Sequence, residues 1–388
     1  MLASIPGLWR RFERAWVLMD RADLAGDNAE HLYRWLREHR PETNAWFVLR
    51  PDSPDFARLK DEGFRLMPYG SVSHQVMLHH AEEYLSSHAG VDVLRPMGDR
   101  LVARRPSWRF TFLQHGVIHN DLSVWLNNQR FDLFVTSSRD EYEGIVGDDT
   151  PYVFTGREVA LVGMPRYDAL RRRADAHPWP ARRTILIAPT WRNSLFLPAA
   201  KPGERRMPRP DFEQSEYVQS LAALLNDERL RRIAERAGLE IVFLPHPNIG
   251  EHFPRHLIPA HVRVTSYAAE NVQDLLANAR VFLTDYSSLA FDAAFAEAAV
   301  VYLQSDDGSI FGGDHTLHPG YFRFDEHGFG PVCRSVDDAV SAVVEAAESI
   351  DSTAPYRERA RRTFTWWDGG GCERLVALLE TPRMSRGV

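Results

Sequence analysis

Two histidines follow apolar, strand-like runs, and their ring nitrogens could move protons near neutral pH. His115 follows Phe110–Leu113 and precedes Gly116, whereas His246 follows Glu240–Leu244 and lies between two prolines. Each would stand at the carboxyl end of a strand, where parallel sheets bind ligands. One ring could accept the proton of an attacking hydroxyl while the other donates to a phosphate oxygen. Taken alone, each could equally be a loop histidine with a structural hydrogen bond.

A third segment has the pattern of a phosphate-binding turn. In Val281–Ala294 an apolar strand ends at Thr284, and Asp285, Ser287 and Ser288 lead directly into a helical pattern. Backbone N–H groups, hydroxyls and the positive end of a helix dipole together favour an anion such as a diphosphate. The alternative is that one of the two serines only caps the helix.

Polar residues after other apolar runs are weaker candidates. Thr190 and Arg192 follow the run Thr184–Ala188, so Arg192 could clamp a phosphate while Thr190 donates its hydroxyl. The alternative for Arg192 is an ordinary surface arginine. The segment Asp306–His318 gathers carboxylates and histidines. We interpret it as an acidic loop and predict no metal site there, because it has no recognised ligand spacing.

The elements that position these residues alternate between apolar runs and helical patterns, which predicts doubly wound parallel sheets. The predicted strands are Ala15–Met19, Ala45–Leu49, Glu83–Ser86, Phe110–Leu113, Leu133–Ser137, Val159–Gly163, Thr184–Ala188, Glu240–Leu244, Val281–Thr284 and Val300–Leu303. The predicted helices include Asn28–Glu38, Val72–His80, Tyr217–Leu225, Val272–Ala279, Leu289–Ala298 and Asp337–Glu348. We interpret Gly163–Asp168 as a turn, Arg171–Arg173 as a charged helix end and His177–Pro180 as a linker.

The length of 388 residues favours two domains, since one hydrophobic core seldom serves so long a chain. We predict an α/β fold with domains at residues 1–175 and 176–355 that face a central cleft. By analogy, helices in 356–388 would return to the first domain. The formal net charge of −7 argues against a nucleic-acid partner. The P-loop, GxGxxG, HExxH and GxSxG motifs are absent from the sequence, which disfavours the enzyme classes that use them.

The compartment and the handling of phosphate are constrained by a few residue types. Cys333 and Cys372 are too few for a disulfide framework, which favours the cytoplasm. Aromatic and arginine residues mix within residues 1–16, which predicts either an interfacial membrane helix or a helix packed on the protein.

Of the 46 basic residues only Lys60 and Lys201 are lysines, leaving 44 arginines. A phosphate site here must therefore use arginine, histidine, hydroxyls and helix N-termini.

Taken in chain order, these segments resemble the CDP-glycerol glycerophosphotransferase family, which includes teichoic-acid primases and polymerases and related capsule enzymes. The resemblance covers nearly the whole chain. The matching motifs are Asp27-Asn28, His115-Gly116, Gly163-x-Pro165-Arg166-x-Asp168, Ala188-Pro189-Thr190-Trp191-Arg192, His246-Pro247, Asp274-Leu275-Leu276, Thr284-Asp285-Tyr286-Ser287-Ser288 with Phe291-Asp292, Gly330-Pro331, and Asp368-Gly369 with Glu373-Arg374.

The resemblance implies a GT-B fold of two Rossmann-like domains, with the donor nucleotide in the second. It implies transfer of an alditol phosphate from CDP-glycerol or CDP-ribitol to a hydroxyl of a lipid-linked or glycan acceptor, with release of CMP. His115 would be the general base, and His246 would stabilise the transferring phosphate. Ser287 and Ser288 would hold the diphosphate. Further donor contacts implied in this way are Thr190, Arg192, Thr284, Asp285, Glu326 and Asp368.

One motif departs from the family pattern. Teichoic-acid members usually have HGT-P-[LF]-K, whereas this chain continues from His115-Gly116 with Val117–Asp121. The acceptor and the alditol therefore stay open, as do a requirement for Mg²⁺, the number of units added and the oligomeric state. Rival hypotheses are a GT-B glycosyltransferase that uses a nucleotide sugar and a non-catalytic nucleotide-binding protein. The resemblance places the enzyme in the cytoplasm or on the inner face of the cytoplasmic membrane.

Overall fold

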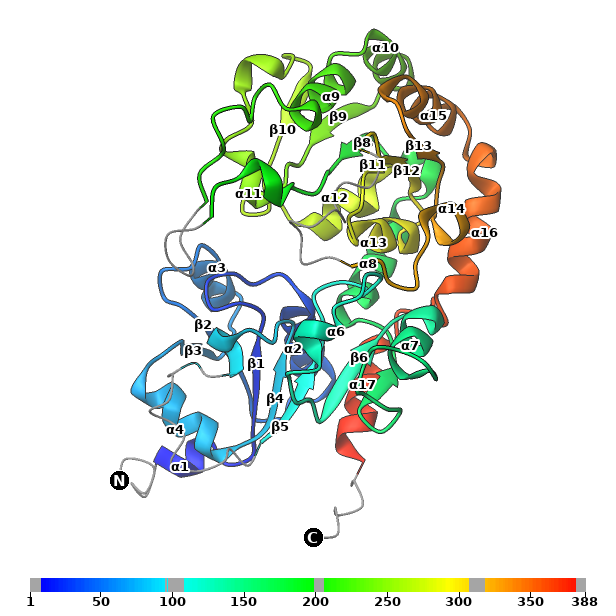
Figure 1. Ribbon diagram of the computed structural model, residues 1–388. Coiled ribbons are helices and arrows are strands. Elements are labelled where there is room, and N and C mark those ends of the chain that lie inside the picture. The colour runs from blue at the N-terminus through cyan, green and yellow to red at the C-terminus, as the bar shows by residue number, and fades with distance from the viewer. Residues whose placement is uncertain (1–7, 95, 97–107, 199–205, 307–317, 382–388) are drawn as a thin grey trace. The chain divides into compact units, whose positions relative to one another are not determined.

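The computed structural model describes residues 8–94, 96, 108–198, 206–306 and 318–381 (Figure 1). The chain divides into two compact units. The first comprises residues 1–117, 123–169 and 368–388, and the second comprises residues 118–122 and 170–367. Each unit contains one wholly parallel sheet, so the predicted doubly wound α/β class is confirmed. The units are described separately below.

The first unit is built on a seven-stranded sheet in the order β3-β2-β1-β4-β5-β6-β7. Its strands are β1 (Ala15–Met19), β2 (Ala45–Leu49), β3 (Leu66–Pro68), β4 (Ala81–Ser86), β5 (Arg109–Phe112), β6 (Leu133–Thr136) and β7 (Val159–Leu161). Most of these strands are short apolar runs, as expected for a parallel sheet covered on both faces, whereas β4 and β5 also contain polar residues. Strand order reverses between β1 and β4, and a doubly wound sheet binds ligands at such a point.

Helices cover this first sheet. They are α1 (Leu8–Arg11), α2 (Asn28–His39), α3 (Asp55–Asp61), α4 (Val72–His80), α5 (Val91–Leu94), α6 (Ser123–Leu126), α7 (Arg139–Val146) and α17 (Gly371–Glu380). Apolar residues of α2 and α17 share one core cluster with strand residues such as Leu18, Phe47 and Val135. The last helix of the chain is therefore part of the first unit.

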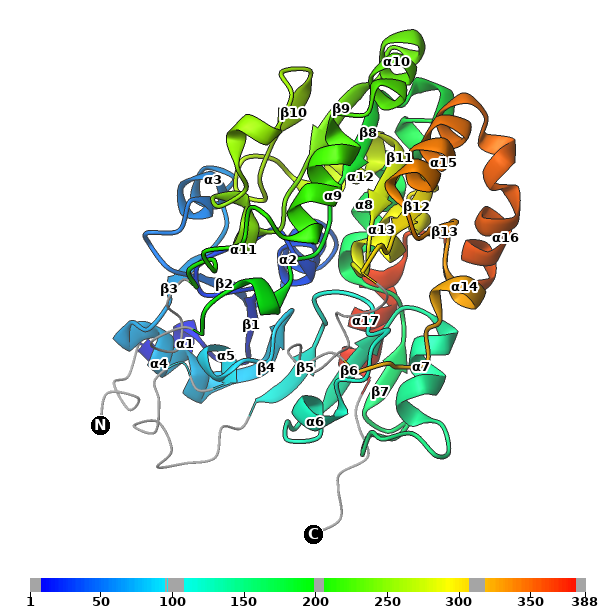
Figure 2. The ribbon, with the colours of Figure 1, turned by 45° about the horizontal axis from the view of Figure 1, so that its top comes forward.

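The second unit has a six-stranded sheet in the order β10-β9-β8-β11-β12-β13. Its strands are β8 (Thr184–Ile187), β9 (Glu240–Phe243), β10 (Val262–Val264), β11 (Ala279–Thr284), β12 (Ala299–Leu303) and β13 (Val332–Cys333). Its helices are α9 (Glu216–Leu225), α10 (Glu228–Ala237), α11 (Pro247–Gly250), α12 (Val272–Asn278), α13 (Leu289–Phe295), α14 (Phe324–His327), α15 (Val336–Glu348) and α16 (Ala354–Thr363), with short 3₁₀ turns at 179–181, 193–195, 255–257 and 350–353. Residues of α9, α10 and α15 pack together on one face of the sheet (Figures 1 and 2).

The structure corrects several local expectations. Helix α8 (Pro165–Ala176) occupies most of the predicted turn at Gly163–Asp168, and it contains the predicted helix end at Arg171–Arg173. Pro165 fits there because proline is favoured at the first position of a helix. The units meet in sequence between Ala169 and Leu170, and the predicted domain limits stay a prediction. Strands β3, β10 and β13 were not foreseen, because two or three residues give too little pattern.

For two of the N-terminal aromatic residues the structure favours packing on the protein. Helix α1 ends at Arg11, and Ala15 already begins β1. Phe12 and Trp16 are buried, and the Phe12 ring packs on Trp46 with centroids 5.3 Å apart. These two side chains belong to the core of the first unit, and membrane contact through residues 1–16 stays a prediction. Residues 1–7 lie outside the described residues. Within the described residues, no helix is long and apolar enough to cross a bilayer.

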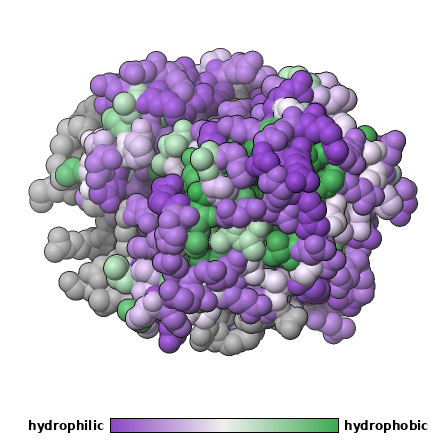
Figure 3. All heavy atoms as spheres, turned by 90° about the horizontal axis from the view of Figure 1, so that it is seen from above, coloured by the Kyte–Doolittle hydropathy of each residue, from purple (hydrophilic) through white to green (hydrophobic). Residues whose placement is uncertain are grey.

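Many surface arginines are paired with carboxylates of neighbouring side chains. On α10, Arg231 pairs with Glu228 and Glu235, while Arg229 bonds to Asp227 and Asp337. Figure 3, which looks down on the side of the molecule where α10 lies in Figure 1, shows a largely hydrophilic face with apolar side chains gathered near its middle.

Candidate functional site

His115 stands at the carboxyl end of β5 and is held by the carboxylate of Asp27. Its Nδ1 lies 2.5 Å from Oδ2 of Asp27, and 63% of its side chain is exposed. Asp27 is the N-cap of α2, where its Oδ1 accepts the N–H of Asn28 at 2.8 Å. Because a carboxylate only accepts hydrogen bonds, the neutral His115 ring carries its proton on Nδ1. Its Nε2 therefore presents a lone pair, as a general base requires.

Arg166 fixes both members of this pair. Its Nη1 donates to Oδ1 of Asp27 at 2.8 Å and to the backbone carbonyl of His115 at 2.7 Å. Arg166 is only 4% exposed. Burial alone would raise the pKa of Asp27, but the His115 ring and the Arg166 guanidinium outweigh it and hold that pKa well below its usual range. Asp27 is therefore an anion at neutral pH.

The backbone before His115 is held in an unusual conformation. Gln114 has a φ of 65°, a region that residues other than glycine seldom adopt. Its carbonyl accepts from the side chain of Asn28 at 2.8 Å, and its buried amide donates to Val135 O and to Glu141. Strain of this kind persists only where neighbouring contacts enforce it, and it is common at functional sites. Here those contacts direct the imidazole.

A second histidine packs against the first. His88 follows β4, and its ring centroid lies 4.7 Å from that of His115. Burial, together with the nearby His115 and Arg21, lowers the pKa of His88 to about 3. His88 is therefore neutral. Its Nε2 accepts a hydrogen bond from Nε of Arg21 at 3.2 Å.

Asp27, His88 and His115 are also the kinds of residue that bind metals. One ligand atom from each lies within 4.8 Å of the others. Arg21 and Arg166, however, already donate to His88 Nε2 and to Asp27, and two guanidinium charges oppose a bound cation. The arrangement is better explained as a hydrogen-bonded acid–base group.

His246 has the opposite ring arrangement. It precedes the first residue of α11, and its Nδ1 accepts the backbone N–H of Asn248 at 3.2 Å. The neutral ring must then carry its proton on Nε2, which makes that atom a donor. The ring stacks on Trp191, with centroids 6.1 Å apart and planes inclined by 21°. His246 is thus suited to donate to an oxygen atom.

Asp285 is the centre of a buried cluster at the carboxyl ends of β8 and β11, here called the Asp285 cluster: Thr190, Arg192, Tyr217, Asp285, Tyr286 and Asp306. Thr190 donates to Asp285 through its backbone N–H at 2.8 Å and its hydroxyl at 2.9 Å. Arg192 donates to Asp285 at 2.8 Å and to Asp306 at 2.7 Å.

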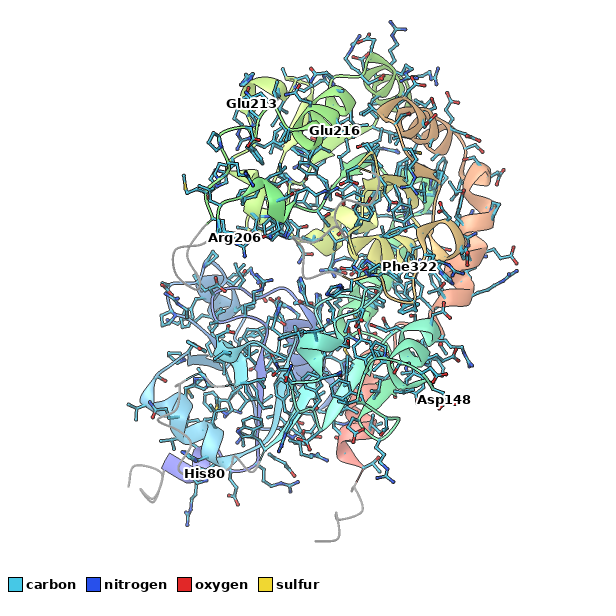
Figure 4. All side chains as sticks on the ribbon, in the orientation of Figure 1. His80, Asp148, Arg206, Glu213, Glu216 and Phe322 are labelled. Carbon is cyan, nitrogen blue, oxygen red and sulfur yellow. The ribbon has the colours of Figure 1, made fainter. Side chains whose placement is uncertain are left out.

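These contacts change the interpretation of Arg192. The residue is 7% exposed, and two carboxylates already compensate its charge. The structure therefore favours a positioning role over the predicted phosphate clamp. The same holds for Thr190 and Asp285, whose side chains join the loops that follow β8 and β11. A cavity of about 30 Å³ adjoins the cluster and is lined by Arg192, Tyr217, Asp285, Asp306 and Glu216. Figure 4 labels Glu216 on α9.

The serines at the start of α13 differ in their bonding. The Ser287 hydroxyl accepts the N–H of Leu289 at 3.2 Å, as a capping residue does. The Ser288 side chain makes no capping bond and is half-buried. Among the described residues its hydroxyl has no hydrogen-bond partner. Thr284 is fully buried and donates to the carbonyl of Ala188 at 2.7 Å, which favours a structural role.

The remaining predicted contacts lie elsewhere. Glu326 is on the exposed helix α14, and its ion pair with Arg323 lowers its pKa despite slight desolvation. Asp368 is in the first unit, where it accepts from Arg374 at 2.8 Å. The structure brings neither into the Asp285 cluster. Of the segment Asp306–His318, residues 307–317 lie outside the described residues.

The sequence interpretation missed several supporting residues. Arg166 lies in the segment interpreted as a turn, and His88 was not considered, although it follows a predicted strand just as His115 does. Asp27 appeared in the family motifs without a role. Parallel sheets bind ligands at the carboxyl ends of their strands, which is here called the strand-end rule. Applying this rule to every predicted strand would have found His88. The bond from Arg166 to Asp27 spans 139 positions and has no local signal.

Comparison with known proteins decides the family. Residues 9–381 match the model of the CDP-glycerol:poly(glycerophosphate) glycerophosphotransferase family. The chain belongs to this family. The assignment made from the motifs is therefore confirmed.

The glycerophosphotransferase chain is 32% identical over 374 residues to the minor teichoic acid biosynthesis protein GgaB of Bacillus subtilis. That match covers 94% of this chain but only 39% of GgaB. Among solved structures, this chain is similar to the wall teichoic acid polymerase TagF, with a TM-score of 0.69 and 13% identity. The match covers 97% of this chain and 91% of the TagF chain. The UDP-GlcNAc 2-epimerase of Neisseria meningitidis matches with a TM-score of 0.52 and 12% identity, covering 95% of this chain and all of that one. These structural likenesses confirm the GT-B fold.

Proposed function

We propose that this chain transfers an alditol phosphate from CDP-glycerol or CDP-ribitol to an acceptor hydroxyl and releases CMP. The acceptor would be the lipid-linked or glycan end of a teichoic-acid or capsule polymer. The observation that carries the proposal is the opposite protonation of two strand-end histidines: Nε2 is an acceptor in His115 and a donor in His246. In phosphoryl transfer to a hydroxyl, an acceptor can take the proton of the attacking hydroxyl, and a donor can stabilise the phosphoryl oxygens.

In the proposed reaction His115 removes the proton from the acceptor hydroxyl. The hydroxyl oxygen attacks the phosphorus that carries the alditol, and the bond from this phosphorus to the oxygen of CMP breaks. CMP leaves with the bonding electron pair, and the proton stays on Nε2 of His115. The imidazolium is stabilised by Asp27, which Arg166 keeps in place.

His246 and Ser288 would act on the donor. The Nε2–H of His246 would donate to an oxygen of the transferring phosphate, where negative charge must be balanced in the transition state. The Ser288 hydroxyl at the start of α13 would donate to the diphosphate. The Asp285 cluster would hold the loops that carry these groups in a fixed arrangement. The proposal places the reaction in the cytoplasm, in keeping with the free, buried thiols of Cys333 and Cys372.

The test is a donor screen with the purified chain. CDP-glycerol, CDP-ribitol and UDP-glucose are each incubated with a lipid-linked acceptor that ends in glycerol phosphate. We expect CMP from one of the CDP-alditols and a product heavier by one alditol phosphate. Release of UDP with transfer of a sugar that lacks phosphate would instead identify a glycosyltransferase. Tight binding of CDP-glycerol without turnover would identify a non-catalytic binding protein.

A further inference from the structure

Arg21 lies next to Asp27, His88, His115 and Arg166, and the five residues are here called the His115 group. Arg21 has no part in the steps above. It is the second residue after β1, whose neighbour in the sheet is β4, and β4 in turn pairs with β5. The loops after these three strands carry Arg21, His88 and His115. The three side chains therefore come from adjacent carboxyl ends, where parallel sheets bind their ligands.

The contact of Arg21 Nε orients the guanidinium and leaves its two Nη groups available. Its Nε donates to Nε2 of His88 at 3.2 Å, and the residue is exposed. Within the described part of the chain its two Nη groups have no hydrogen-bond partner, and no carboxylate pairs with them. By contrast, Arg50 and Arg14 each form a two-point pair, with Asp52 and Glu82.

The neutral ring of His88 is what allows this orientation. A protonated ring would have no lone pair for Arg21 and would repel it. The backbone N–H of His88 is fixed by the Ser86 hydroxyl at 3.2 Å, and its ring rests on His115. Since Arg166 already compensates Asp27, Arg21 supplies the positive charge in this group that no carboxylate balances.

We propose that Arg21, held by His88, binds a phosphate group of the acceptor whose hydroxyl His115 deprotonates. A guanidinium with two free Nη groups fits phosphate oxygens in a fork, which a lysine cannot reproduce. The inference rests on the proposed function and specifies it: the acceptor end carries a phosphate close to the reacting hydroxyl, as an alditol phosphate does. Arg21 would then select acceptors by charge.

The experiment compares two acceptors that share a reacting alditol hydroxyl, one with an adjacent phosphate and one without. Arg21→Gln should raise the KM of the phosphorylated acceptor about 10- to 100-fold, since charge-assisted bonds are lost. The KM of CDP-glycerol and the use of the neutral acceptor should not change. Arg21→Lys should restore part of the affinity. The matched control is Arg172→Gln, an exposed arginine on α8, which should behave as wild type.

Two results would overturn the inference. One is an unchanged KM for the phosphorylated acceptor in Arg21→Gln; the other is an equal rise for both acceptors. If the wild-type chain releases no CMP, the proposed function itself fails. Calorimetric binding of glycerol 3-phosphate then decides about Arg21 alone, because only a phosphate subsite predicts weaker binding to Arg21→Gln than to Arg172→Gln.

Discussion

At the residue scale, the chemistry of each histidine depends on which ring nitrogen carries the proton. A carboxylate acceptor at Nδ1 makes Nε2 of His115 an acceptor, and a backbone donor at Nδ1 makes Nε2 of His246 a donor. Both rings follow a parallel strand, so the strands alone do not distinguish them. The distinguishing partners are Asp27 and the N–H of Asn248, and both can be probed by substitution.

The first prediction concerns Asp27. In Asp27→Asn the amide can donate to Nδ1 of His115, which would move the ring proton to Nε2 and remove the base. We expect the rate of CMP release to fall roughly 10²- to 10⁴-fold, the usual range for losing a general base or its correct tautomer. Asp61→Asn, at an exposed site on α3, is the control. A rate within twofold of wild type in Asp27→Asn would show that Asp27 does not set the tautomer.

The second prediction concerns acid stability. The pKa of Asp27 is lowered in the folded state, so its contribution to stability is complete above the unfolded pKa of about 4. That contribution is lost as the pH falls from this value through the folded pKa. The difference in Tm between wild type and Asp27→Asn should therefore be largest near pH 6 and shrink below pH 4. A difference that grows with acidity would contradict the assigned charge.

At the scale of elements, the helix α17 shows how distant motifs cooperate. The carboxylate of Asp168 on α8 accepts the N–H groups of Gly371 and Cys372 at 2.8 and 2.9 Å. Two positions earlier, Arg166 reaches Asp27 and His115. One turn of α8 thus anchors the C-terminal helix and the Asp27–His115 pair, which gives the Gly163–Asp168 motif a physical meaning.

The third prediction follows from this cap. Asp168→Ala leaves two N–H groups of α17 without acceptors in a buried place and should destabilise the first unit by about 2 kcal/mol. Asp168→Asn retains one acceptor oxygen and should cost less. Denaturant unfolding measures both. Equal stability of Asp168→Ala and wild type would show that the cap contributes nothing.

The fourth prediction tests the packing of α17. Leu375 is fully buried in the core of the first unit, whereas Leu378 on the same helix is 37% exposed. Leu375→Ala should lower the free energy of unfolding by about 2–5 kcal/mol, and Leu378→Ala should lower it far less. Similar losses in both variants would contradict the placement of this helix.

Elements with a strong pattern could be predicted from the sequence, and side-chain partners could not. Helix α4 begins and ends where its pattern predicted, and β1 and β2 match their predicted limits. The strand-end rule placed His115 and His246 correctly at the ends of β5 and β9. It could not show that Arg192 is buried between two carboxylates, because ion pairs between loops depend on tertiary packing.

At the scale of the whole molecule, the described arginines fall into two groups according to their contacts. Most described arginines pair with surface carboxylates, and exposed pairs of this kind contribute little to stability. Arg166 and Arg21 differ, because each lies in the His115 group and bonds there in a specific way. Pairing with surface carboxylates therefore describes the surface arginines, but it does not describe Arg21 and Arg166.

The fifth prediction separates these two groups. The double substitution Arg231→Lys with Arg232→Lys on α10 should change neither Tm nor the rate of CMP release appreciably. Arg166→Lys should sharply lower the rate, since an ammonium group does not reproduce the planar guanidinium whose Nη1 bonds to both Asp27 and the His115 carbonyl. A normal rate in Arg166→Lys would show that charge alone, without geometry, supports the pair.

The most direct test of the account is the single-turnover rate of CMP release from CDP-glycerol in His115→Gln and His246→Gln, with His261→Gln as an exposed control. The account predicts that each of the first two variants stays folded, still binds CDP-glycerol and releases CMP at least about 100-fold more slowly. The control should match wild type. Undiminished CMP release in either His115→Gln or His246→Gln would contradict the proposed division of proton transfer between the two histidines.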